Sequence, residues 1–149
     1  MGNFWEEIFA NQVLWITLLS WAIAQGIKII IGLAQGKKFN FYWILRTGGL
    51  PSAHSAAVVA LATALGQEVG FQTPFFALSA IFALITMFDA QTWRRSIGVQ
   101  ARILNKIMED FHEGKKLKEK RMKELVGHTP VEIFAGGLIG VVTAVVFYV

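Results

Sequence analysis

The chain has 149 residues, of which 54% are hydrophobic and 16% are charged, and its mean hydropathy is +0.50. So apolar a composition excludes a disordered chain, and the charged fraction is well below the about 25% of an ordinary soluble domain. The absence of cysteine excludes disulfides, thiolate zinc sites, iron–sulfur clusters and cysteine nucleophiles. The formal net charge of +4 suggests an anionic partner, and the position of the bases decides what that charge means.

Four apolar stretches predict helices that cross a membrane. Residues 13–33 contain a single charge, Lys28, and as a helix they are about 31 Å long, enough to cross a bilayer core. Residues 53–70, 74–90 and 131–149 follow, and these stretches mostly lack the polar face of a soluble helix. The second stretch is the weakest, because its apolar part is close in length to a buried soluble helix. We therefore expect one all-α domain over 1–149, a polytopic integral membrane bundle of about four transmembrane helices.

The basic residues are concentrated in the two segments that connect these helices on one side, 35–50 and 91–127. Positive charge marks cytoplasmic loops, so both segments are predicted to be cytoplasmic and both termini outside. Every lysine and arginine except Lys28 lies there: Lys37, Lys38, Arg46, Arg94, Arg95, Arg102, Lys106, Lys115, Lys116, Lys118, Lys120, Arg121 and Lys123.

The basic segment 91–127 is expected to contain a helix of its own. Apolar residues recur at near-helical spacing from Ile97 to Phe111, with polar residues between them, which predicts an amphipathic helix on the membrane surface. Gly114 then opens a solvated, strongly basic run. That run is most simply attracted to anionic lipid headgroups, and a direct catalytic role is the alternative. We predict no nucleic-acid partner.

Ionisable residues in or beside apolar spans indicate function in membrane proteins. The candidates are Lys28, His54, Asp89, Arg94, Arg95, His128 and Glu132. All except Lys28 lie at the cytoplasmic end of a predicted span, so three distant segments converge on one membrane face. Lys28 either joins this site or extends its ammonium group to the interface. Asp89 either contributes to the site or pairs with an arginine.

The segment Gly48 to His54 has the chemistry of an anion site. Its glycines allow close backbone approach, and Pro51 suits a first helical turn. Free amides at a helix start, near Ser52, attract anions. His54 would lie beside such an anion and donate a proton to a leaving group.

His128 and Glu132 are four residues apart at the start of the last span, which places both side chains on one helix face. A carboxylate that accepts one imidazole N–H leaves the other nitrogen available as a nucleophile. Glu132 is also explained as a first-turn acid favoured by the helix dipole. Gly136 and Gly140 form a close-packing face, and small-residue faces of this kind also allow an oligomer.

These residues resemble a known family. The run Leu50 to Ser55 is similar to the PSGH element of the type 2 phosphatidic acid phosphatases, which share a superfamily with the vanadium haloperoxidases. The run Gly127 to Glu132 resembles their last element, a nucleophilic histidine followed four residues later by an acid. Further pieces resemble the divergent bacterial and plant branch of that family over nearly the whole chain: Ala24-Gln25 with Lys28, GGLPSAHSA at 48–56, ITMFDA at 85–90, Arg94-Arg95, Gly98 to Ala101, and Gly136-Gly137.

The sequence departs from the main family at several positions. Lys38 and Arg46 are eight apart and Thr47 follows where the family has proline. Ala53 replaces the glycine of PSGH, Met122 stands where an arginine precedes the nucleophile, and Glu132 replaces aspartate.

The resemblance implies a membrane phosphatase that hydrolyses a phosphomonoester or diphosphate of a lipid, in a bacterial-type plasma membrane or a plastid membrane. It implies that His128 is the nucleophile that forms a phosphohistidine, oriented by Glu132, and that His54 is the acid and base. The phosphate ligands would be Arg46, Arg94, Arg95, Ser52 and Lys28, with Asp89 nearby, and the scheme requires no metal or other cofactor. A non-enzymatic protein that binds or transports anionic lipid, and a degenerate phosphatase that binds lipid phosphate without turnover, are the alternatives.

The charge asymmetry yields a test of topology. Reporter fusions at Gly2 and at Val149 are expected to report both ends outside the cytoplasm, because the basic segments hold the opposite loops inside. Two cytoplasmic ends would contradict this orientation and the leaflet that follows from it.

Overall fold

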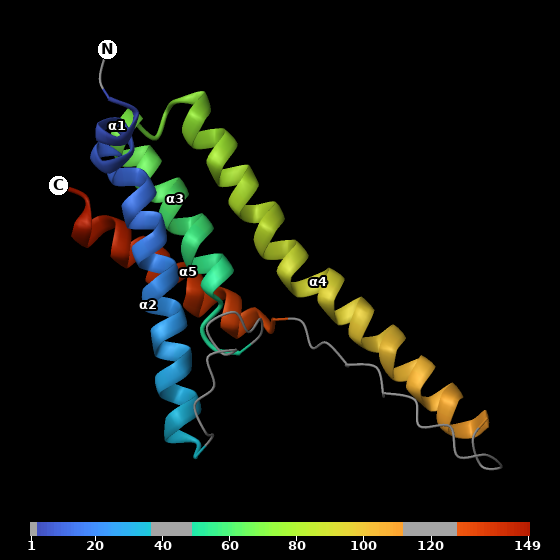
Figure 1. Ribbon diagram of the computed structural model, residues 1–149. Helices are drawn as coiled ribbons and strands as arrows, with labels where there is room; N and C mark the ends of the chain where they lie inside the picture. The colour runs from blue at the N-terminus through green and yellow to red at the C-terminus, as the bar shows by residue number, and fades with distance from the viewer. Residues whose placement is uncertain (1–2, 37–48, 112–127) are drawn as a thin grey trace.

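The computed structural model describes residues 3–36, 49–111 and 128–149, and the side chains of residues 93–97, 110 and 111 also lie outside the description. The regular structure within these ranges is helical (Figure 1). It comprises α1 (Phe4–Ala10), α2 (Gln12–Ala34), α3 (Ala53–Val69), α4 (Pro74–Phe111) and α5 (Pro130–Phe147). The predicted all-α class is confirmed.

Three segments are long and apolar enough to cross a membrane: Gln12–Ala34, Pro74–Thr92 and Pro130–Phe147. They correspond to the predicted spans 13–33, 74–90 and 131–149. The fourth predicted span, 53–70, coincides with α3, which has 17 residues and is not among these three segments. A polytopic helical membrane protein is therefore established, while a count of four spans stays a prediction.

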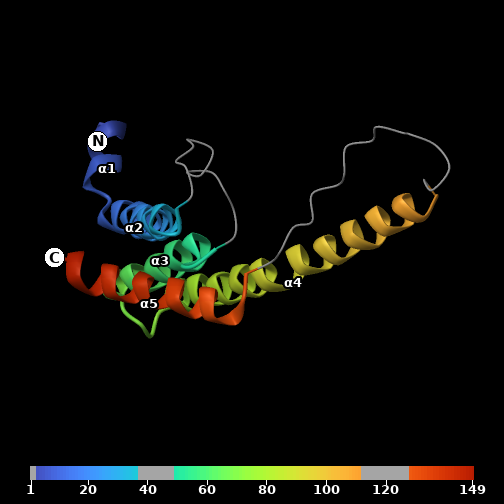
Figure 2. The ribbon, with the colours of Figure 1, turned by 90° about the horizontal axis from the view of Figure 1, so that it is seen from below.

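Helix α3 lies at the centre of the bundle and packs against α2, α4 and α5 (Figures 1 and 2). Its buried residues are small and point to several sides: Ala53, Ser55, Ala56, Val58, Ala60, Ala62, Ala64 and Gly66. Since lipid tails are as apolar as the helices, membrane helices associate through close packing, which small side chains permit. Helix α3 is therefore less apolar than the other predicted spans because it is surrounded by α2, α4 and α5.

The closest approach is between the backbones of α3 and α5. A Cβ atom added at Gly140 would lie 2.6 Å from the carbonyl oxygen of Ala56 and 2.9 Å from the amide nitrogen of Ala60. At Gly136 it would lie 2.2 Å from the carbonyl oxygen of Ser52. The predicted close-packing face of Gly136 and Gly140 therefore contacts α3 of the same chain. An oligomer formed through other small-residue faces stays a prediction.

Polar side chains tie α3 to its neighbours. The Ser20 hydroxyl on α2 donates to the carbonyl oxygen of Ala56 at 3.1 Å, within the buried seam. At the opposite end from the start of α3, the Tyr148 hydroxyl donates to the Glu68 carboxylate at 2.5 Å. This hydrogen bond raises the pKa of Tyr148 because it stabilises the protonated phenol, and burial and the negative charge of Glu68 act in the same direction.

Helix α4 differs from the prediction in its length. The third span was expected to end at residue 90 and a separate amphipathic helix to follow, but α4 runs without a break from Pro74 to Phe111. The predicted helicity after residue 97 is correct, and the apolar span ends at Thr92, close to the predicted residue 90. The expected break between the span and the amphipathic helix is absent. A helix of 38 residues is about 57 Å long, whereas the bilayer core is about 30 Å thick. The predictions for Lys37, Lys38, Arg46 and the basic run 115–125 lie outside the described residues.

The glycines of α5 offer a matched pair of substitutions. Gly140→Ala is expected to lower the free energy of unfolding by about 1–3 kcal/mol, because its methyl group meets backbone atoms that cannot move independently. Gly137→Ala, whose Cβ would lie 3.6 Å from Val59 Cγ2 in ordinary contact, is the control and should be neutral or stabilising. Thermal unfolding in detergent measures both, and equal stability of the two variants would contradict this packing.

Candidate active site

The starts of α3 and α5 lie side by side at one end of the bundle. Ser52, which caps α3, donates its backbone N–H to the carbonyl oxygen of Glu132 in α5 at 2.9 Å. Ser52 is completely buried, and its own carbonyl oxygen lies against Gly136. Contacts between Ala56 and Gly140 continue further along both helices, so the helices run parallel. Both positive helix ends therefore face the same region.

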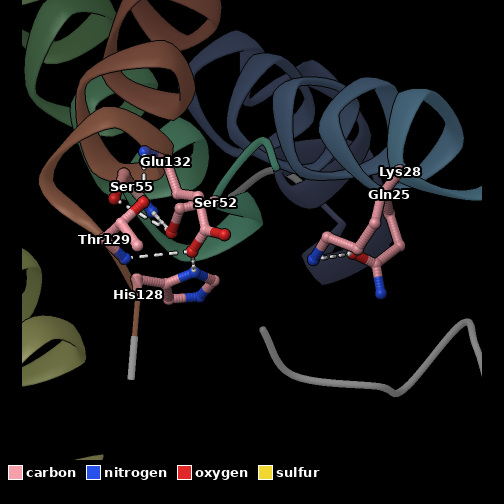
Figure 3. A network of polar contacts seen from close by, with 7 residues as sticks. All are labelled: Gln25, Lys28, Ser52, Ser55, His128, Thr129 and Glu132. Carbon is pink, nitrogen blue, oxygen red and sulfur yellow. Dashed lines mark hydrogen bonds and ion pairs between the residues drawn. The ribbon is translucent and has the colours of Figure 1, made fainter. Parts of the chain in front are cut away.

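His128 and Glu132 form a hydrogen-bonded pair at the start of α5 (Figure 3). His128 Nδ1 lies 2.9 Å from Glu132 Oε2, and the His128 side chain is completely buried while that of Glu132 is 19% exposed. A carboxylate only accepts hydrogen bonds, so Nδ1 carries the proton and in the neutral ring the lone pair is at Nε2. In Figure 3 the Nε2 side of the ring faces away from Glu132.

A capping box holds this pair in place. The Thr129 backbone N–H donates to Glu132 Oε2 at 3.1 Å, and the Thr129 hydroxyl accepts from the Glu132 backbone N–H at 3.3 Å. The same carboxylate oxygen thus serves the helix start and the imidazole. The two explanations of Glu132 that the sequence left open, a first-turn acid and a partner of His128, are both satisfied by one geometry. Thr129 was not singled out, although the spacing Thr129 to Glu132 is the signature of a capping box.

His54 and α4 complete the inner part of the site. The rings of His54 and His128 have centroids 6.2 Å apart and planes inclined by 59°. The His128 backbone N–H donates to the carbonyl oxygen of Ala90 in α4 at 3.1 Å. The structure therefore brings together the three distant segments that the topology places on one face.

Helix α2 contributes Gln25 and Lys28. Lys28 Nζ donates to Gln25 Oε1 at 3.0 Å, and Gln25 is buried although it lies in a membrane span. The aliphatic part of Lys28 runs past Gly49, since a Cβ added there would lie 3.7 Å from both Lys28 Cγ and Cδ. Gly49 has a φ of 92°, a backbone conformation that side chains disfavour. Lys28 thus lies beside the segment that leads into His54.

Ser52 was predicted to bind phosphate, and its contacts within the protein are structural. Its hydroxyl oxygen accepts from the Ser55 hydroxyl at 3.0 Å and from the Ser55 backbone N–H at 3.3 Å. Its backbone N–H is bound to the carbonyl oxygen of Glu132. These contacts fix the first turn of α3 and its position against α5.

The structure brings the other predicted residues together only in part. Asp89 is exposed on α4, and its side chain makes no hydrogen bond or ion pair within the described part of the chain. Arg94 and Arg95 lie in α4, but their side chains are outside the described part, as is Arg46. In the ranges that the structure describes, no three His, Asp or Glu side chains form a group that would hold a metal ion.

The fold defines the class as a polytopic helical membrane protein, with a histidine–glutamate pair where two helices begin. Comparison with known proteins identifies the family: the chain belongs to the divergent PAP2 family, whose family model matches residues 9–143. It is also similar to the uncharacterized membrane protein YuiD of Bacillus subtilis (strain 168), with 42% identity over 151 aligned residues, 94% of this chain and 96% of YuiD. No solved structure matches the chain.

The shared carboxylate oxygen gives a test that does not depend on activity. Glu132→Ala removes the acceptor for both His128 and Thr129 and is expected to lower the free energy of unfolding by about 1–2 kcal/mol. Glu132→Gln keeps an acceptor oxygen and should lose less. Thermal unfolding in detergent would contradict the arrangement if the two variants were equally stable.

Proposed function

We propose that the protein is a membrane phosphatase that hydrolyses a phosphomonoester or a diphosphate of a lipid through a phosphohistidine. The observation that carries the proposal is the Nδ1 to Oε2 contact between His128 and Glu132, with His54 beside the pair. Membership of a PAP2-related family supports the same chemistry.

In the first step, His128 Nε2 attacks phosphorus. The N–P bond forms, the P–O bond to the lipid breaks, and the leaving oxygen takes a proton from His54. Glu132 holds the ring in the tautomer that has its lone pair at Nε2 and stabilises the charge that develops on it.

In the second step, water replaces the lipid oxygen. His54, now neutral, accepts a proton from a water molecule as its oxygen attacks phosphorus, and the P–N bond breaks. Inorganic phosphate leaves, His128 regains its lone pair at Nε2, and His54 regains its proton.

Positive charge around the site would stabilise the equatorial oxygens in both steps, where phosphoryl transfer concentrates negative charge. Lys28 and the N-terminal ends of α3 and α5 supply it within the described part of the chain. Arg46, Arg94 and Arg95 are proposed as further ligands, and Ser52 is proposed to act mainly by fixing the helix start. Asp89, exposed on α4, is proposed to orient one of these arginines.

The proposed orientation puts the site on the cytoplasmic side. A substrate made on that leaflet fits it best, and phosphatidylglycerophosphate and phosphatidate are such lipids. An isoprenyl diphosphate is the remaining member of the proposed class.

Phosphate release from purified protein in detergent tests the mechanism. With phosphatidate, phosphatidylglycerophosphate and an isoprenyl diphosphate as substrates, His128→Ala is expected to lower kcat at least about 1,000-fold, because the nucleophile is lost. His54→Ala should lower it about 100- to 10,000-fold, the usual contribution of a general acid.

The leaving group separates the two histidine roles. With p-nitrophenyl phosphate, whose leaving group needs no proton, the first-turnover release of nitrophenolate by His54→Ala should be slowed much less than the release of a lipid alkoxide, although later turnovers still need His54 to activate water. His128→Ala should lose the first turnover with both substrates. Equal phosphate release by wild type and His128→Ala would overturn the mechanism. Lipid binding without release from any substrate would favour a non-enzymatic lipid-binding protein.

A further inference from the structure

Helix α1 carries three aromatic side chains that the rest of the bundle leaves uncovered. Phe4, Trp5 and Phe9 are 65%, 61% and 67% exposed, whereas Ile8 in the same helix is half-buried. Single apolar groups on a surface are ordinary, but a contiguous apolar patch marks a surface that meets a partner. Three large rings within this short helix form such a patch.

The apolar and the charged residues of α1 occupy opposite faces. Successive residues are about 100° apart around a helix, so the large apolar side chains fall within an arc of about 140°. They are Phe4, Trp5, Ile8 and Phe9. Glu6 and Glu7 lie on the other side of the helix. A helix with one apolar and one charged face lies in the plane of a membrane surface, with its apolar face toward the acyl chains.

The span that follows α1 places it at the membrane surface. Asn11 separates α1 from α2, and its Oδ1 accepts from the Leu14 backbone N–H at 2.9 Å to cap α2. The segment Gln12–Ala34 is long and apolar enough to cross a membrane. Figures 1 and 2 show α1 turned across the axis of α2 rather than continuing it. Helix α1 therefore lies across the beginning of this span.

One ring contact shows which face of α1 is turned toward the bilayer core. Phe9 stacks on Trp15 of α2, with ring centroids 6.0 Å apart and planes inclined by 6°. Trp15 lies about 4.5 Å inside the span from Gln12 and is 44% exposed, so its ring borders lipid. The face of α1 that carries Phe9 is therefore the lipid-facing one, and the two carboxylates are on the water side.

This end of the bundle is opposite the histidine site. Val13 near the start of α2 and Tyr148 after the end of α5 pack against one cluster of buried residues, whereas the His128–Glu132 pair lies at the start of α5. The sequence contains no basic side chain before Lys28, so the carboxylates give α1 a negative charge. Anionic headgroups attract bases and repel carboxylates, and the surface of α1 thus fits zwitterionic lipid.

We propose that α1 is an anchor that lies in the headgroup boundary of the leaflet opposite the candidate site, with its aromatic face toward zwitterionic lipid. Aromatic side chains favour this boundary, because their rings are in apolar surroundings there while water stays within reach. The stacking of Phe9 on Trp15 joins the anchor to α2 and so fixes how deeply that span lies in the membrane. Such anchoring goes beyond the proposed function and does not depend on it.

Spin labels on single cysteines test the depth of the two faces, and a sequence without cysteine makes each label unique. Trp5→Cys carries the label on the aromatic face, and Glu7→Cys carries it on the charged face two residues away. Glu7 is the matched position rather than Glu6, whose carboxylate accepts a backbone N–H at the start of α1. Phe9→Cys and Ala10→Cys are a second pair on the same two faces, used if a variant of the first pair does not fold.

The labelled full-length chain is placed in phosphatidylcholine vesicles with a water-soluble nickel chelate on both sides, and collisions with the label are measured by electron paramagnetic resonance. Oxygen concentrates among the acyl chains, whereas the chelate stays in water. The ratio of oxygen to chelate collisions is expected to be at least about fivefold higher at position 5 than at position 7, because the aromatic face is seated in lipid. Replacing part of the lipid by phosphatidylglycerol is expected not to raise the ratio at position 5.

Equal ratios at positions 5 and 7 would overturn anchoring by the aromatic face. Exclusion of both oxygen and chelate from position 5 would also overturn it, because protein would then cover the rings. The covering protein would be a second copy if the labels broaden one another's spectra, and this chain's own bundle if they do not. A ratio that rises with phosphatidylglycerol would overturn the preference for zwitterionic lipid.

Discussion

The contact between the backbones of α3 and α5 is the constraint on which the rest of the structure depends. Gly136 lies against the carbonyl oxygen of Ser52 and Gly140 against Ala56, distances that exclude any side chain. Within a bilayer, helices gain little from hiding apolar surface, and close packing decides how they associate. The same contact brings two helix starts together, so the packing that holds the bundle also sets the separation of His54 and His128.

Polar groups in this apolar chain are arranged to satisfy one another, since unsatisfied groups are costly where water is scarce. Ser20 bonds to a carbonyl of α3, and Ser52 and Ser55 close the first turn of that helix. Glu132 accepts from two donors with one oxygen. A helix start stabilised in this way keeps its imidazole in one tautomer, which is the preorganisation that phosphoryl transfer requires.

Local signals in the sequence predicted most of the fold and the contact between His128 and Glu132 in the candidate site. Uninterrupted apolar stretches located three spans, and the four-residue spacing of His128 and Glu132 predicted their contact. Features that depend on tertiary structure were not accessible in this way. The internal role of Ser52 depends on where α5 lies, and the contact of Lys28 with Gly49 depends on how α2 meets a loop. The change from apolar to amphipathic residues near 90 resembled an end, yet it occurs inside one continuous helix.

That continuous helix has a mechanical consequence. An α-helix is stiff along its axis, and α4 is about 27 Å longer than the bilayer core is thick. Its carbonyl at Ala90 holds the backbone of His128, part-way along its length. The backbone of His128 is therefore held by the same stiff element that extends beyond the membrane core to Phe111.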